Sequence, residues 1–73
     1  MPQLPVISGA EAVRAFERDE WRRDRQRGSH VVMVKAGHIA SLSIPQHREL
    51  APGTLRALIR SSGLTVEGFV ALL

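Results

Sequence analysis

A valine-rich run from His30 to Lys35 follows the pair Gly28-Ser29, and this junction constrains the fold more than any other feature of the chain. β-Branched residues favour strands, and glycine gives the backbone the freedom that a tight turn requires. The pattern predicts two strands, Trp21 to Gln26 and His30 to Lys35, joined by that turn. A second turn at Ala36-Gly37-His38 leads to a third predicted strand, Ile39 to Ile44.

Helical patterns lie on both sides of these strands. Ser8 and Glu11 have the spacing of a capping box, and the apolar residues after them predict a helix from about Gly9 to Asp19. A second helix is expected to start at Pro52, because a proline suits the first turn, and Gly63 is the expected C′ residue that ends it. Thr65 is expected to cap a short third helix. The order predicts an α+β fold of the α-β-β-β-α type, a three-stranded antiparallel sheet with helices packed on one face.

The composition narrows the class of protein. Seventy-three residues make one small domain, so a single unit over residues 1–73 is expected. There is no cysteine, which excludes disulfides and thiolate metal sites. The N-terminus has no basic region followed by a long apolar one, and no apolar run approaches the ~20 residues that span a bilayer. We therefore expect a cytoplasmic protein without membrane contact.

The second predicted strand is apolar on both of its sides. Val31 and Met33 share one side, and Val32 and Val34 share the other with His30. One side must meet the helices. The sequence leaves open whether a partner chain covers the second side or whether it forms a partly exposed apolar patch.

Basic residues gather just before this strand. Nine of the ten basic residues are arginine, and Arg22, Arg23, Arg25 and Arg27 fall within six positions. The planar guanidinium suits phosphate, although such a run is also typical of a solvated face. His30 follows the cluster directly. Its imidazole exchanges a proton near neutral pH, and fixed cations beside it would stabilise charge on a phosphate. These residues indicate phosphodiester chemistry or nucleic-acid contact.

Four strings in order carry a family resemblance. They are Leu4-Pro5-Val6-Ile7-Ser8-Gly9, Arg25-Gln26-Arg27-Gly28-Ser29-His30, Ile44-Pro45-Gln46-His47 and Gly53-Thr54-Leu55-Arg56. With these strings the chain resembles the HicA (YcfA-like) family of bacterial toxins over nearly its whole length. The resemblance implies a fold like the double-stranded-RNA-binding domain and an mRNA-cleaving toxin that a HicB antitoxin neutralises. It also implies that the histidine of the Gly-Ser-His motif, His30 here, is the essential residue.

Two positions depart from the family pattern. Glu20 stands where relatives usually carry a glycine that ends the first helix in a left-handed conformation. Asp19 or Glu20 must therefore make that turn. Gly68 stands where relatives usually have a helix-favouring residue, and it weakens the last helix by ~1 kcal/mol relative to alanine. Neither change touches the motif around His30.

The expected chemistry needs no metal, because RNA carries its own nucleophile, the 2′-hydroxyl. His30 is expected to act as the general base that takes its proton. The expected RNA-binding residues are Arg25, Arg27, Gly28, Ser29, Lys35 and Arg56. The three histidines do not have zinc-ligand spacing. We expect no metal and no small-molecule cofactor.

Several residues keep two interpretations. His47 is either a second proton-transfer group or a structural loop residue, and His38 is expected to be solvated in its turn. Trp21 is either a core anchor or a platform for a base. Arg56 and Arg60 lie one turn apart and are either phosphate contacts or an ordinary polar helix face.

Three functions remain compatible with the sequence. The first is a metal-independent endoribonuclease acting as the toxin of a type II toxin–antitoxin pair. The second is a non-catalytic RNA-binding module of the same fold. The third is an interaction domain whose sheet serves as a docking surface.

Overall fold

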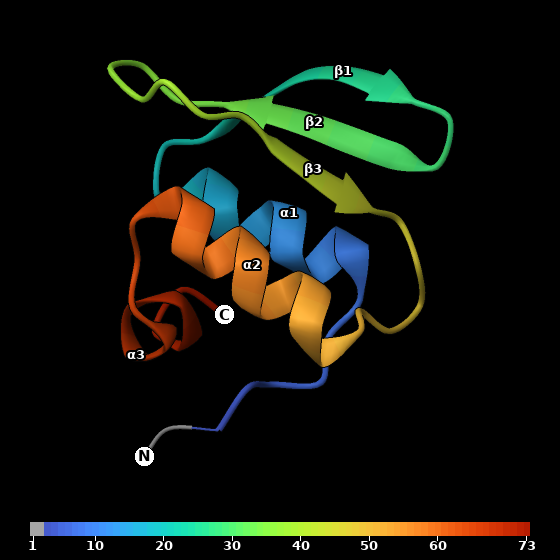
Figure 1. The fold of residues 1–73 in the computed structure, drawn as a ribbon, viewed down its shortest axis with the longest axis vertical. Coiled ribbons are helices and arrows are strands. Elements are labelled where there is room, and N and C mark those ends of the chain that lie inside the picture. Colours follow the sequence, from blue (N-terminus) through green and yellow to red (C-terminus); the bar gives the residue numbers. More distant parts are fainter. Residues whose placement is uncertain (1–2) are drawn as a thin grey trace.

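An antiparallel sheet of three strands lies over a layer of two helices, with a short third helix beside them (Figure 1). The computed structural model describes residues 3–73, so Met1 and Pro2 of the expected 1–73 unit lie outside the described residues. The elements are α1 (Gly9–Arg18), β1 (Arg22–Arg27), β2 (His30–Val34), β3 (Leu42–Pro45), α2 (Pro52–Ser62) and α3 (Val66–Val70). The α+β fold, consistent with the expected double-stranded-RNA-binding-domain type, is confirmed.

Helix α1 begins at the predicted capping box. The Ser8 hydroxyl accepts from the Glu11 amide at 3.1 Å, and the Ser8 amide donates to the Glu11 carboxylate at 2.9 Å. The two contacts satisfy donors that a helix start leaves open. The helix ends at Arg18, and Glu20 then adopts the left-handed conformation with φ 69°. This non-glycine residue makes the turn that carries Trp21 into the core.

Three aromatic side chains centre the core. The ring centroids of Phe16 and Phe69 are 4.9 Å apart, and those of Phe16 and Trp21 are 6.4 Å apart. Trp21 is only 2% exposed. The core-anchor interpretation of Trp21 is therefore confirmed, and its use as a stacking platform for a base is wrong. Phe69 ties the short helix α3 to the same core.

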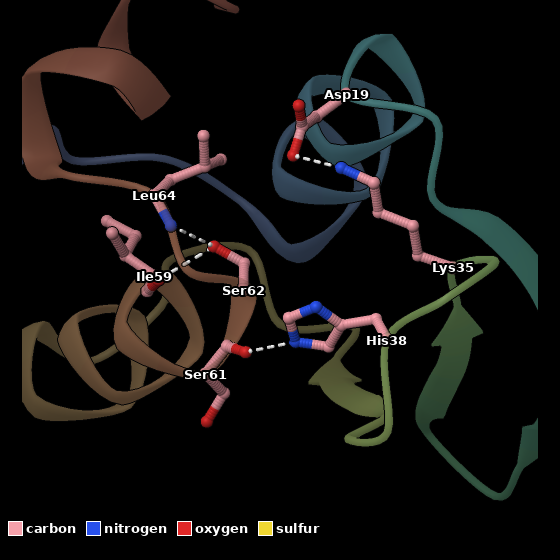
Figure 2. A network of polar contacts seen from close by, with 7 residues as sticks. All are labelled: Asp19, Lys35, His38, Ile59, Ser61, Ser62 and Leu64. Carbon is pink, nitrogen blue, oxygen red and sulfur yellow. Dashed lines mark hydrogen bonds and ion pairs between the residues drawn. The ribbon is translucent and has the colours of Figure 1, made fainter.

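Strand β3 is shorter than predicted at its start. The prediction began at Ile39, whereas the strand begins at Leu42 and continues to Pro45. The physical reason is His38, whose Nε2 lies 2.8 Å from the Ser61 carbonyl oxygen of α2 (Figure 2). Its ring also lies edge-on to Trp21, with centroids 4.8 Å apart. These contacts draw the chain toward α2, and the expectation that His38 is solvated is wrong.

The sheet register decides which side chains share a face. In β2, Val31 and Met33 belong to the core that the helices cover. Val32 points to the opposite face, yet it is only 6% exposed. Its cross-strand neighbours are Arg25 in β1 and Ser43 in β3. Side chains of this chain therefore cover much of the second apolar side, whose coverage the sequence left open.

Candidate active site

The face of the sheet turned away from the helices carries a shallow groove of about 420 Å³. Three strands and the loop before β3 contribute to it. Its lining residues are Arg25, Arg27, His30, Val32, Ser41 and Ser43. The groove therefore brings together the predicted catalytic histidine and two of the predicted arginines.

His30 stands at one end of this groove. It is the first residue of β2 and lies opposite Arg27 in β1 and Pro45 in β3. Its side chain is half-buried. The Gln46 amide donates to the Ser29 carbonyl oxygen at 2.6 Å, which ties the turn before His30 to the end of β3. The backbone of His30 is thus held between two strands, and its half-buried side chain lines the groove.

The turn before His30 has the predicted character. Gly28 has φ 57°, a left-handed conformation that side chains rarely adopt. An added Cβ at Gly28 would meet nothing within 4 Å. Gly28 and Ser29 are both exposed beside the histidine. The open space leaves the backbone free for a close approach by a ligand.

The groove arginines differ in their partners. The Arg25 guanidinium is 2.7 Å from the Asp24 carboxylate, and both side chains are largely exposed. Such an exposed pair contributes about 0–1 kcal/mol, so a phosphate can replace it. Arg27 has no ion pair within residues 3–73.

A register shift in β1 brings to the groove side of the sheet an arginine that belongs to the basic cluster but is not among the expected RNA-binding residues. The pairing shifts between Arg23 and Arg25, so Arg23 lies opposite Met33 and Arg22 lies opposite Val34. Simple alternation from Arg25 would have turned Arg23 to the groove side. The shift turns Arg22 there instead. Nothing in the sequence marks the position of such a bulge.

Ser41 and Ser43 line the groove but were not among the expected site residues, although the alternation of residues in β3 could have indicated Ser43. Ser43 alternates with the buried residues Leu42 and Ile44, which predicts that it faces away from the core. In the structure that face is the floor of the groove.

Two of the predicted RNA-binding residues lie away from the groove. Lys35 follows the far end of β2, and its ammonium is 3.2 Å from the Asp19 carboxylate (Figure 2). Arg56 lies on α2 and lines a separate groove of about 270 Å³ together with Arg60. His47 is exposed in the loop after β3, and its carbonyl oxygen accepts from the Gly9 amide at 2.9 Å.

Within residues 3–73, no three histidine, cysteine, aspartate or glutamate side chains lie together as a candidate metal site. Over the same residues, no helix has the length and apolarity to cross a membrane.

The fold and groove define a small α+β domain that presents one histidine among arginines on an open sheet. The family model described as the HicA toxin of bacterial toxin–antitoxin systems matches residues 9–64, which include α1, the whole sheet and α2. The chain belongs to the HicA toxin family. A comparison with curated proteins gives no match.

Proposed function

We propose that this chain is the toxin of a type II toxin–antitoxin pair and acts as an endoribonuclease on mRNA. The observation that carries the proposal is the half-buried His30 imidazole at the end of an arginine-lined groove. Membership of the HicA toxin family supports the toxin part of the proposal.

In the proposed reaction, a ring nitrogen of His30 accepts the proton of an RNA 2′-hydroxyl. The 2′-oxygen then forms a bond to the adjacent phosphorus, and the bond from phosphorus to the 5′-oxygen breaks. The leaving 5′-oxygen takes a proton from solvent. The products are a 2′,3′-cyclic phosphate and a 5′-hydroxyl. General-base catalysis of this kind typically contributes ~10²–10⁴-fold to the rate.

The groove arginines provide the electrostatic part of catalysis. Arg25 and Arg27 would bind the scissile phosphate and stabilise the charge that develops on its oxygens. The Ser29 hydroxyl would donate to a phosphate oxygen, and Gly28 would let the backbone approach. Lys35 would reach RNA only after release from Asp19, so the proposed reaction depends on the arginines.

Arg56 has a more distant role in this proposal. It would contact a phosphate of the same RNA from the helical side of the molecule, because it lies on α2 rather than in the groove. The competing interpretation is an ordinary polar helix face. Neutralising Arg56 should weaken RNA binding without changing the rate of the chemical step.

The proposed partner is a HicB-like antitoxin. Its physical task is to keep RNA away from His30, and a segment that covers the basic groove would achieve this. An acidic segment would also complement the exposed guanidinium groups.

Growth arrest tests this function directly. Expression of the wild-type chain in a host without the antitoxin should arrest growth, and co-expression of a HicB-like protein should relieve the arrest. His30→Ala should be harmless while it still binds RNA in vitro. If the variant is equally toxic, His30 is not the base. If the wild-type chain binds RNA without cleaving it, the chain is a non-catalytic RNA-binding module.

A further inference from the structure

We infer that Arg22 is a third phosphate-binding residue on the groove face of the sheet, so that an RNA strand runs along β1 from Arg27 toward Arg22. The inference deepens the proposed function and rests on it for the position of the cleaved bond. The bulge in β1 is the observation that carries it.

The register places three arginines on one face in a single row. Arg27 lies opposite His30, and Arg25 lies opposite Val32, and both line the groove. Arg22 lies opposite Val34, the next residue of β2 on that side. Directly opposed side chains in an antiparallel pair share a face.

The row has the length of a short RNA segment. Strands rise about 3.4 Å per residue, so the four steps from His30 to Val34 span ~14 Å. The two arginines already in the groove are about 7 Å apart along the strand. This separation is comparable with that of neighbouring phosphates in an extended single strand, so three arginines match three consecutive phosphates.

The charge of Arg22 is available to a ligand. Arg22 is exposed and takes part in no ion pair over the described part of the chain. Its neighbour Arg23 faces the other way and lies 3.8 Å from the Glu17 carboxylate. The two arginines are therefore a matched pair, identical in charge but on opposite sides of β1.

The exposed face of α1 offers a weaker alternative for this strand. The exposed residues of α1 are Ala10, Glu11, Arg14, Glu17 and Arg18, whose charges cancel. A polyanion gains little electrostatic free energy from such a surface. The open sheet face, with three arginines in a row, is favoured instead.

Binding of a single-stranded oligonucleotide to His30→Ala tests the inference without cleavage. Adding Arg22→Gln should lower the affinity about fivefold and reduce the slope of log K against log salt by ~0.7, the value for one phosphate on a single strand. Arg23→Gln in the same background should change neither quantity appreciably. Equal effects of the two substitutions would overturn the inference.

A neutral methylphosphonate placed at one position of the oligonucleotide locates the contact. One position, two phosphates from the bond that the active protein cleaves, should weaken binding when Arg22 is present and have no effect with Arg22→Gln. Loss at every position regardless of the variant would contradict the row. If the wild-type protein cleaves nothing but the Arg22 coupling is found, the proposed function fails and this binding site stands.

Discussion

Gly9 is the glycine at which one added methyl group should lower the stability of the fold most. A Cβ built on Gly9 would lie 2.0 Å from the Pro45 carbonyl oxygen and 2.9 Å from the Gln46 Cα. Both are backbone atoms, so no side-chain rotation relieves the clash. An ordinary contact begins near 3.4 Å, so α1 and the end of β3 must separate by about 1.4 Å.

The expected loss of stability follows from this movement. Separation would break the hydrogen bond from the Gly9 amide to the His47 carbonyl oxygen, worth ~0.5–1.5 kcal/mol. Forcing extra volume into a packed junction typically destabilises by ~1–3 kcal/mol. We therefore expect Gly9→Ala to lower the free energy of unfolding by about 2–4 kcal/mol. For a domain of this size, each kcal/mol shifts Tm by ~4–8 °C.

Gly53→Ala is the matched control. Gly53 is also helical, but a Cβ there would meet nothing within 4 Å. The substitution should stabilise the protein by ~0.4–1 kcal/mol, because alanine has less conformational entropy to lose on folding. Urea unfolding followed by the fluorescence of the buried Trp21 measures both variants. If Gly9→Ala is as stable as the wild type, the close packing of α1 against the Pro45 carbonyl is refuted.

Further substitutions test other parts of the structure. Glu20→Gly should raise the free energy of unfolding by about 1 kcal/mol, because glycine relieves the strain of the left-handed conformation. Glu20→Ala should give no such increase, and thermal unfolding of the two variants measures the difference. The pKa of Glu11 lies below its usual 4.5, because hydrogen bonds with the backbone of Ser8 and, second, with its side chain favour the charged carboxylate. The capping box therefore stabilises the folded state fully above pH 4.5, and this stabilisation is lost as pH falls through the folded-state pKa. Glu11→Gln should flatten this acid-side loss in unfolding curves measured from pH 6 downward, and an unchanged curve would contradict it. Asp24→Asn should free Arg25 and raise RNA affinity about threefold at low salt; an unchanged dissociation constant would show that the pair does not compete with phosphate.

Local signals in the sequence were sufficient for the helices. Ser8 and Glu11 act on each other within one turn, and Gly63 ends α2 in the left-handed conformation with φ 83°. Glu20 was one of two residues expected to make the turn after α1. Each of these features depends on residues close together in the chain, which is why the sequence predicts them.

Features that depend on contacts between residues far apart in the chain were not predicted from the sequence. The start of β3 was misplaced because His38 hydrogen-bonds to Ser61, which is 23 residues away in the chain. Lys35 was expected to bind RNA, but it forms an ion pair with Asp19, which is 16 residues away in the chain. Neither contact produces a periodic pattern in the sequence that could predict it.

The candidate site was predicted in its centre but not at its edge. His30, Arg25 and Arg27 share the groove as the motif suggested. Arg22 belongs to the basic cluster but was not among the expected RNA-binding residues, because a bulge decides which face it lies on, and the position of the bulge depends on how β1 pairs with β2. A one-residue irregularity in a run of charged residues changes no hydrophobic pattern.

Cleavage of an end-labelled RNA by purified wild-type and His30→Ala proteins tests the central claim most directly. We expect the wild-type protein to leave 2′,3′-cyclic phosphate ends at a rate that EDTA does not change. His30→Ala should be slower by ~10²-fold or more while its RNA affinity stays near that of the wild type. Cleavage by His30→Ala at the wild-type rate, or products that carry a 3′-hydroxyl and a 5′-phosphate, would contradict the claim that this imidazole activates the 2′-hydroxyl.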